Sequence, residues 1–231
     1  MMQHVAVVIP AKNEERRIAA CLSAVLAASA RCPVDVSVTL VADGCTDRTV
    51  PLARSFAGVE VVEIAASNVG VGRALGVRHA LRSLTVHPAG VWIANTDADS
   101  IVPSDWIAQQ LLRAEAGVDA VLGSVVPDPA EYPRDLQQRW AHAHPAGRAT
   151  PEIYGANLGV RASAYLRAGG FAALAEHEDV DLVRRLRAPR VRYSDASPVI
   201  TSARLDGRTP GGFAGYLRAE REVEAPIVEL S

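Results

Sequence analysis

The sequence predicts an α/β fold built on a mainly parallel sheet with helices on both faces. Short apolar runs alternate along the first hundred residues with longer segments of helical periodicity. These runs are hydrophobic at nearly every position, as in strands that are covered on both faces. Polar residues of interest follow the ends of the runs, where ligands bind in such sheets.

The first half is predicted to follow a β-α-β-α-β-α-β order. The predicted strands cover residues 4–9, 36–41, 59–64 and 91–94, and the predicted helices cover about 14–29, 46–56 and 69–84. Helices that connect successive strands favour parallel neighbours joined by right-handed crossovers. The carboxyl ends of the strands should therefore meet at one edge of the sheet.

The second half is less regular. Pro103 suits a first helical turn, and a helix over 104–117 ends at Gly117, followed by a strand over 119–126. Residues 127–153 contain five prolines and are expected to form a loop-rich insertion over the site, around a short helix at 134–143. A linker between two domains is the alternative, but it would leave a C-terminal piece with few strands.

Composition excludes several classes of function. A net charge of -2 over 231 residues provides no broad basic field, so we expect no nucleic-acid partner. The three cysteines are odd in number and lack metal-binding spacing, which favours a reducing cytoplasm. No apolar run is long enough to span a membrane, and the weakly polar run at 18–30 is predicted to be a helix rather than an export signal.

Two carboxylates, Asp97 and Asp99, follow the fourth predicted strand with only Ala98 between them. If the chain turns there, both can reach one ligand, and carboxylate oxygens suit Mg²⁺ or Mn²⁺. Two carboxylates are too few for a metal site made of protein alone, so a diphosphate is the expected source of further oxygens. An exposed Asp-Ala-Asp turn is the alternative that this pattern leaves open.

Asp43 directly follows the second predicted strand, in the segment VADGCTDRT. Thr46 and Asp47 are accounted for as N-cap candidates of the next helix, but Asp43 is not. Its carboxylate can accept a hydrogen bond from the ring N–H of a base or from a ribose hydroxyl. We predict that it faces the same crevice as Asn13 and Glu14, which follow the first strand.

Five segments in this order resemble the family 2 glycosyltransferases of the GT-A fold. They are VAVVIPAKNEE (5–15), VADGCTD (41–47), NTDADS (95–100), GANLGVR (155–161) and EHEDVDLVRRL (176–186). The resemblance covers about residues 4–188. It implies a GT-A-like, Rossmann-like sheet with a smaller acceptor-side region, in one domain over 1–231. Residues 1–100 would form the nucleotide-binding half and 101–231 the acceptor-side half.

The resemblance also implies a metal-assisted transfer, with inversion, of a sugar from a nucleotide-diphosphate donor to an acceptor hydroxyl. UDP is the expected nucleotide. Asp43 would lie near the base, Asp97 near the ribose or base, and Asp99 on Mg²⁺ or Mn²⁺. Pro10, Asn13 and Glu14 would line the nucleotide pocket, and Asn157 and Glu178 would lie on the acceptor side. The sugar, the acceptor and the oligomeric state are not specified by the sequence, and a retaining outcome stays open because retaining enzymes share this fold.

The glycines of NVGVGRALG imitate a dinucleotide-binding fingerprint, but they follow the third predicted strand instead of the first. Close packing at a helix entry is the preferred interpretation, with Arg73 as a candidate contact of a phosphate or base. At three positions this sequence departs from the residues usual in the family, with Ala42 in place of Asp, Cys45 in place of Ser and Ala74 in place of Asn. These departures leave the identity of the nucleotide open.

The helix predicted to begin near Glu178 carries Asp179 on the same face as its apolar residues, so Asp179 should point inward. Such a carboxylate is either a cap stabilised by the helix dipole or, by the family resemblance, the general base. Further on, Arg204 and Arg208 lie in a loop containing Gly and Pro that either closes over a leaving diphosphate or is simply solvated.

Two other classes of function compete with sugar transfer. An apolar strand followed by DADS also imitates the nucleophile strand of haloacid-dehalogenase-type phosphatases. The departures from the family pattern would also suit a catalytically silent nucleotide-sugar-binding module.

Overall fold

Four parallel strands form the first half of one large sheet. The computed structural model describes residues 1–186, 188–207 and 211–222. Strands β1 (His4–Ala11), β2 (Asp35–Asp43), β3 (Val59–Ile64) and β4 (Val91–Asn95) lie in the order β3-β2-β1-β4. All three pairings between them are parallel. The carboxyl ends of these strands therefore lie along one edge, as predicted.

The sheet continues from β4 with strands of mixed direction. The full order is β3-β2-β1-β4-β7-β6-β8-β5, in which β7 (Leu158–Arg161) is antiparallel to both β4 and β6 (Ala120–Pro127). Strand β8 (Val191–Thr201) runs parallel to β6, and the short β5 (Ser100–Ile101) runs antiparallel to β8. This pairing brings the segment that follows β8 back toward β5 and Asp99.

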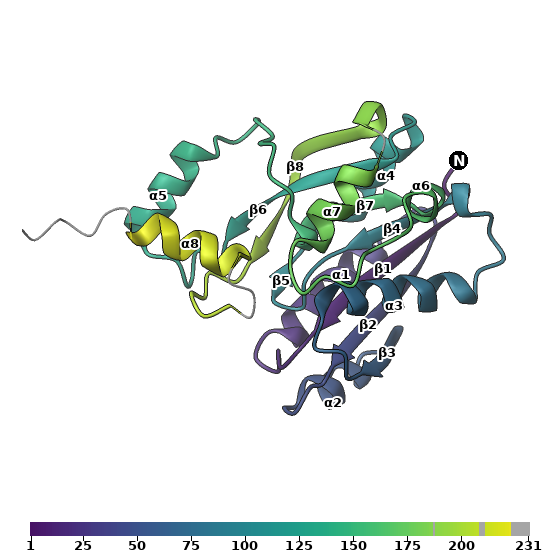
Figure 1. Ribbon diagram of the computed structural model, residues 1–231, viewed down its shortest axis with the longest axis horizontal. Helices are drawn as coiled ribbons and strands as arrows, with labels where there is room; N and C mark the ends of the chain where they lie inside the picture. The colour runs from purple at the N-terminus through teal and green to yellow at the C-terminus, as the bar shows by residue number, and fades with distance from the viewer. Residues whose placement is uncertain (187, 208–210, 223–231) are drawn as a thin grey trace, which may run out of the picture.

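Helices cover both faces of the sheet (Figure 1). Their bounds are α1 Ile18–Ser29, α2 Thr49–Arg54, α3 Val69–Arg82, α4 Trp106–Glu115, α5 Arg134–Ala143, α6 Ala162–Arg167, α7 Glu178–Arg185 and α8 Phe213–Glu222. Short 3-10 turns occupy Pro88–Gly90, Gly155–Asn157 and Ala188–Arg190. No helix in the described part of the chain is both long and apolar enough to cross a bilayer.

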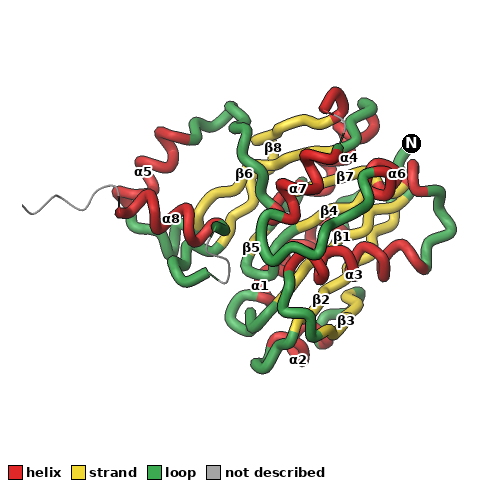
Figure 2. The backbone as a smooth tube through the Cα atoms, in the orientation of Figure 1, coloured by secondary structure: helices red, strands yellow, loops and turns green. Residues whose placement is uncertain are grey.

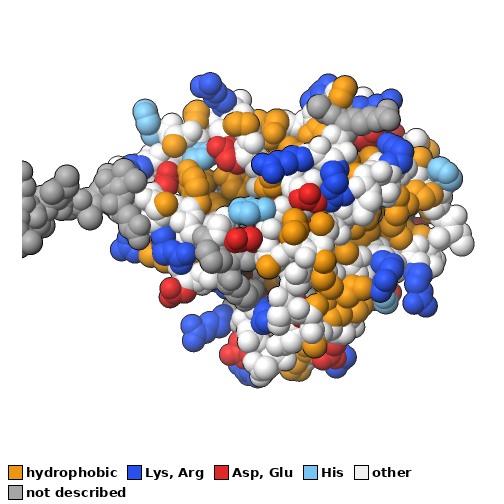
Figure 3. All heavy atoms as spheres, in the orientation of Figure 1, with side chains coloured by type: hydrophobic (Ala, Val, Ile, Leu, Met, Phe, Trp, Pro, Cys, Tyr) orange, Lys and Arg blue, Asp and Glu red, His pale blue; other side chains and the backbone are white. Residues whose placement is uncertain are grey.

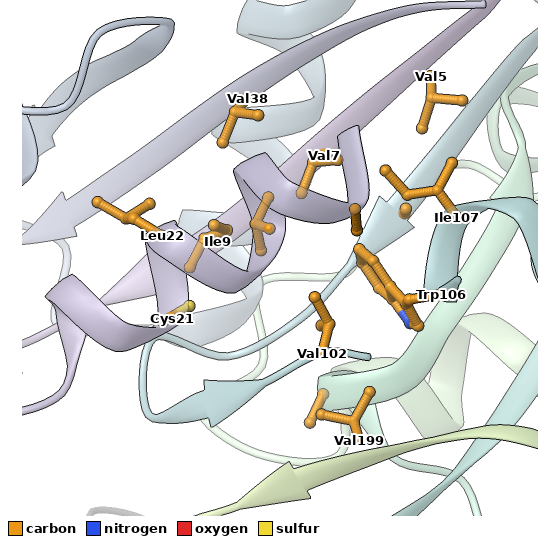
Figure 4. Close-up of a cluster of buried hydrophobic side chains, with 14 of the residues drawn as sticks. Val5, Val7, Ile9, Cys21, Leu22, Val38, Val102, Trp106, Ile107 and Val199 are labelled. Atoms are coloured by element: carbon orange, nitrogen blue, oxygen red, sulfur yellow. The ribbon is translucent and has the colours of Figure 1, made fainter. Parts of the chain in front are cut away.

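Alternate residues of β1 supply two separate cores. Val5, Val7 and Ile9 pack with Leu22 of α1 and Trp106 of α4 in the core on one face (Figure 4). Ala6 and Val8 belong to the core on the other face, with α3, α6 and α7. This two-sided burial explains why the strand is apolar at every position after His4.

A third, smaller core joins α5 and α8 at one end of the molecule, beyond the end of the sheet (Figure 2). It contains Leu136 and Trp140 of α5 and Leu217 of α8. The insertion predicted over 127–153 is thus anchored to the C-terminal helix, which the sequence analysis did not predict.

Predicted and observed elements agree for the first four strands and for the helix over 134–143. The helix predicted from residue 14 is wrong in its first turn, because α1 begins at Ile18. The backbone N–H groups of Glu14 and Glu15 instead donate to Thr49 Oγ1 and an Asp47 carboxylate oxygen, at 2.7 and 2.9 Å. Similarly, the helix predicted over 46–56 is shorter, at Thr49–Arg54.

Gly76 of α3 serves close packing, as the sequence favoured. A Cβ on Gly76 would lie 2.5 Å from Val8 Cγ1 and 2.8 Å from Val41 Cγ2, whereas one on Gly72 would come no closer than 3.8 Å to Pro10 Cβ. We expect Gly76→Ala to lower the free energy of unfolding by about 1–3 kcal/mol through overpacking. Gly72→Ala is the matched control in the same helix and should be neutral or stabilising, by up to about 1 kcal/mol. Urea unfolding of both variants checks this, and equal losses would contradict it.

Candidate active site

The predicted site residues emerge from neighbouring strands at the carboxyl edge of the sheet. Asn13 and Glu14 follow β1, Asp43 ends β2, and Asp97 and Asp99 follow β4. Since β2, β1 and β4 are consecutive in the sheet and parallel, these segments leave it at the same edge. The side chains then divide into linked groups, each organised by an arginine or by backbone N–H groups.

Arg73 of α3 organises the first group. Its guanidinium is 2% exposed and donates from Nη2 to Asp97 Oδ1 at 2.6 Å and from Nε to Glu178 Oε1 at 2.9 Å. Within the described part of the chain, Nη1 is buried without a hydrogen-bond partner. Burial favours neutral groups, but the two carboxylates outweigh it and raise the pKa of Arg73, so the cation is retained. The Asp97 side chain is 36% exposed, so this buried cation has an acidic partner that faces solvent.

Asp179 lies beside this pair. It occupies the first turn of α7, as predicted, on the helix face that carries the fully buried Leu182. Burial raises the pKa of the Asp179 carboxyl above its ordinary value, and Arg73 opposes the shift. A Cβ on Gly155 would clash with Arg73 Nη2 and lie 3.2 Å from Asp179 Oδ2. The missing side chain at residue 155 therefore makes room for the guanidinium and the carboxylate together.

Removing the Arg73 guanidinium should destabilise the fold. Arg73→Met would leave Glu178, whose side chain is 6% exposed, as a buried carboxylate without its cation. We expect a loss of about 3–5 kcal/mol in the free energy of unfolding. Arg54→Met breaks the exposed pair with Glu63, in which the side chains are 59% and 54% exposed, and should cost less than about 1 kcal/mol. Urea unfolding measures both, and a loss for Arg73→Met no larger than the control would contradict this account.

Arg204 organises the second group. Its Nη1 and Nη2 donate to the two carboxylate oxygens of Glu14 at 2.9 and 2.7 Å, and Nη2 also lies 2.9 Å from Asp99 Oδ2. Glu14 is buried, and the Asp99 side chain is 15% exposed. Burial and then the neighbouring Asp97 raise the pKa of Asp99 to about 6, although Arg204 acts against them. The negative charge at Asp99 is thus only partly compensated.

A cavity of about 670 Å³ opens beside this second group. Its walls come from the loop after β1, the start of α1, the segment 99–101 and the loop after β6. The lining residues are Asn13, Glu14, Glu15, Arg16, Arg17, Ala20, Asp47, Asp99, Ile101, Asp128, Glu131 and Arg204. This volume falls in the range of small-molecule sites, and the lining is dominated by charged groups of both signs.

The carboxylates of this site fit a divalent cation only with help from a ligand. Within the described residues, no group of three or more His, Cys, Asp or Glu side chains could hold a metal ion alone. Asp99 is a single, partly compensated carboxylate at the edge of the cavity, and Mg²⁺ commonly binds through one or two carboxylates plus substrate phosphates. The donor set therefore matches a metal that arrives with a diphosphate.

Asp43 is held by backbone N–H groups. Its Oδ1 accepts from Ala66 and Ser67 and its Oδ2 from Asn68, each at 2.8 Å. These bonds fix the entry into α3, the helix that carries Arg73. The contact with a base that the sequence analysis expected stays a prediction, and Asp43 would have to make it while keeping these three bonds.

Asn13 and Pro10 are the remaining residues predicted to line the nucleotide pocket, and they lie at the carboxyl end of β1. Asn13 has a positive φ of 51°, accepts from the Thr46 backbone N–H at 2.7 Å and donates to Thr46 Oγ1 at 3.2 Å. The loops after β1 and β2 are thereby tied together. Pro10 is half-buried and pairs with Val41 of β2.

Asn157 is engaged in the interior of the protein. Its Oδ1 accepts from Trp106 Nε1 at 2.8 Å, and its Nδ2 donates to the carbonyls of Ser124 and Ser197 at 2.8 and 3.0 Å. A 2% exposed amide with these three partners joins α4, β6 and β8. Its place on the acceptor side stays a prediction. The observed hydrogen bonds show that the side chain holds α4, β6 and β8 together.

Arg208, which was predicted to contact a diphosphate, lies outside the described residues.

The sequence analysis missed two features of the site, the pairing of Arg204 and the role of Gly155. Arg204 was considered for a diphosphate, but its bidentate pairing with Glu14, 190 positions away, was not foreseen. Gly155 begins the GANLGVR segment. The only sequence signal for its place beside Asp179 was a glycine at the start of a segment that proves to be buried.

Comparisons with known proteins identify the family of this chain. The family model described as "Glycosyl transferase family 2" matches residues 6–169. A curated 4,4'-diaponeurosporenoate glycosyltransferase from Staphylococcus aureus (strain bovine RF122 / ET3-1) is 38% identical over 93 residues, which are 40% of this chain and 23% of that protein. The match therefore covers less than a quarter of that relative's length.

Solved structures show a similar fold. S. aureus TarS 1-349 matches with a TM-score of 0.64 and 14% identity over 88% of this chain and 61% of that one. TarS 1-349 in complex with UDP-GlcNAc matches with a TM-score of 0.65 and 13% identity over 89% of this chain and 60% of that one. The mannosyltransferase PcManGT from Pyrobaculum calidifontis, in complex with GDP-Man and Mn²⁺, gives a TM-score of 0.59 and 22% identity over 98% of this chain and 71% of that one.

Proposed function

The chain belongs to glycosyl transferase family 2, and from this premise we propose that it transfers a sugar from a nucleotide-diphosphate donor to an acceptor hydroxyl. One observation carries the proposal. Asp97, Asp99 and Asp179 gather around two arginines at the carboxyl edge of β1 and β4, and Asp99 opens on a cavity large enough for such a donor.

The donor nucleotide is proposed to bind between the loops after β1 and β2 and the start of α3. The buried Nη1 of Arg73, which has no partner among the described residues, is a donor positioned for a base or phosphate oxygen. Asp97 can accept from a ribose hydroxyl with the carboxylate oxygen that Arg73 does not occupy. UDP stays the expected nucleotide, and the similar structures were solved with UDP-GlcNAc in one case and with GDP-Man in another, so both donors belong in the test.

Asp179 is proposed as the general base. In this role it removes the proton from the acceptor hydroxyl as the oxygen attacks the anomeric carbon from the face opposite the leaving group, which inverts the configuration. Partial burial favours this task because it raises the pKa of Asp179 toward the operating pH. Arg73 and Glu178 hold the surrounding charges in place.

Asp99 and Arg204 are proposed to act on the departing diphosphate. Mg²⁺ or Mn²⁺ held by Asp99 would supply positive charge for the diphosphate oxygens. The Arg204 guanidinium now pairs with Glu14 and Asp99, and it can instead donate to a phosphate that enters the cavity. Residue 204 thus keeps the acidic pocket neutralised until an anion and its cation arrive.

The pH dependence of transfer should report the Asp179 carboxyl. A base acts only when deprotonated, so kcat/KM should fall as the pH drops through its pKa. Because burial raises that pKa, the fall should begin above the ordinary value of 3.8. The pH-rate profile at saturating Mn²⁺ measures this. A profile that stays flat down to pH values near 3.8 would contradict the assignment.

The proposal is tested by measuring release of nucleoside diphosphate from UDP-, GDP- and dTDP-sugars with Mn²⁺, using water as the acceptor. Release from at least one donor supports it. Donor binding without any release would instead identify the silent binding module. The family match removes the grounds for the haloacid-dehalogenase-type phosphatase, and release of inorganic phosphate from p-nitrophenyl phosphate would restore them.

A further inference from the structure

Aromatic side chains cluster beside the third core, at the end of the molecule formed by α5 and α8. The Trp140 ring packs edge-on against Phe213 at 5.6 Å and against Tyr216 at 5.8 Å. Phe213 and Tyr216 lie nearly parallel to each other, with centroids 6.5 Å apart. Trp140 is 4% exposed, whereas Tyr216 is 41% exposed. Hydrophobic side chains are also visible deep between α5 and the body of the molecule (Figure 3).

This aromatic cluster is connected to the proposed base. The Tyr154 ring meets Phe213 edge-on at 6.0 Å. Residue 154 immediately precedes Gly155, the position at which a Cβ would lie 3.2 Å from Asp179 Oδ2. The aromatic cluster is therefore linked through Tyr154 to the residue that packs against the proposed base.

Polar groups without partners lie among the aromatic rings. The Tyr132 hydroxyl and Glu152 Oε2 are buried with no hydrogen-bond partner within the described residues, although the Tyr132 side chain belongs to the same core. Glu152 lies two residues before Tyr154 in the same segment, and burial and then the Glu152 carboxylate raise the pKa of Tyr154. Buried polar groups are costly unless something bonds to them, so these atoms indicate a polar ligand.

We propose that α5, α8 and the segment 152–154 form an acceptor subsite that binds a carbohydrate, an inference that rests on the proposed function. The apolar face of a sugar ring would pack on Tyr216 and Phe213, while its hydroxyls donate to Glu152 and bond to Tyr132. A lipid chain in the same place would cover Glu152 without giving it a partner, which costs free energy. The mixture of aromatic faces and unpaired oxygens therefore favours a sugar over a lipid.

The test is binding of four sugars, methyl α-D-glucoside, methyl α-D-mannoside, methyl N-acetyl-β-D-glucosaminide and maltose, measured by saturation-transfer NMR. At least one should bind the wild-type chain, and Tyr216→Ala should weaken that binding by about tenfold. Tyr193→Ala is the matched control, because Tyr193 is 42% exposed and lies on β8, and it should bind as the wild type does. Tyr216→Phe keeps the ring and should retain most of the affinity.

A second variant guards against a folding defect in Tyr216→Ala, which thermal melting would reveal. Glu152→Gln keeps the size of the side chain but removes the charge, and it should weaken sugar binding by about tenfold. The inference is overturned if none of the sugars binds, if both variants bind normally, or if neutral phosphatidylcholine vesicles bind in their place. Donor hydrolysis by the wild-type chain tests the proposed function separately, so the two can fail independently.

Discussion

Replacing Asp179 by Asn should reduce sugar transfer by about 10²–10⁴-fold while leaving donor binding nearly unchanged. The substitution preserves the size of the side chain but removes its ability to take a proton. Asp179 touches none of the donor groups proposed to bind at Asp97 and Asp99, so the loss should appear in kcat and not in the donor dissociation constant. Steady-state kinetics together with calorimetry of donor binding separates the two quantities.

The matched control for this variant is Asp181→Asn. Asp181 occupies the same first turn of α7, but it is 37% exposed and pairs with Arg185. Its substitution should leave transfer within a small factor of the wild-type rate. Normal turnover by Asp179→Asn, or an equal loss in Asp181→Asn, would remove Asp179 from the role of base.

Replacing Asp99 by Asn should lower kcat/KM by about 10²–10³-fold and abolish the effect of Mn²⁺ on donor binding. Asp99 is the carboxylate that borders both Arg204 and the cavity, so it is the group best placed to hold a cation against a diphosphate. An amide at this position binds a divalent cation more weakly because it carries no charge. Donor titrations with and without Mn²⁺ measure the effect.

Asp105→Asn is the control for Asp99. The Asp105 carboxylate accepts from Ser197 Oγ at 2.9 Å, a bond that an Asn oxygen can also accept, and it does not line the cavity. Its kinetics should resemble those of the wild type. Retention of the Mn²⁺ effect in Asp99→Asn would show that another group holds the metal.

Much of the fold could be predicted because the signals were local. Strands covered on both faces have continuous apolar runs, so the bounds predicted for β1 to β4 fall close to those observed. The parallel order also follows from the helices between these strands. The position of Asp179 could be inferred because Leu182 follows it at helical spacing, and Leu182 is indeed fully buried.

The rest depended on contacts between distant parts of the chain. Strand β8 was missed because exposed and buried residues alternate irregularly along it and because it contains Pro198, which has no N–H to donate to a neighbouring strand. The Arg204 pairing with Glu14 joins residues 190 positions apart, and no local pattern encodes such a contact. The packing of α8 on α5 through the third core also joins distant parts of the chain, so it could not be predicted from the sequence either.

Thermal melting with UDP-, GDP- and dTDP-sugars, with and without Mn²⁺, most directly tests the claim that these carboxylates bind a sugar-bearing diphosphate through a divalent cation. A donor at 100 times its dissociation constant adds about 2.7 kcal/mol of stability. For a chain of this size, each kcal/mol raises Tm by about 2–4 °C. We expect at least one donor to raise Tm by roughly that product, only with Mn²⁺ and not in Asp99→Asn. No rise with any donor, or a rise that persists in Asp99→Asn, would contradict the claim.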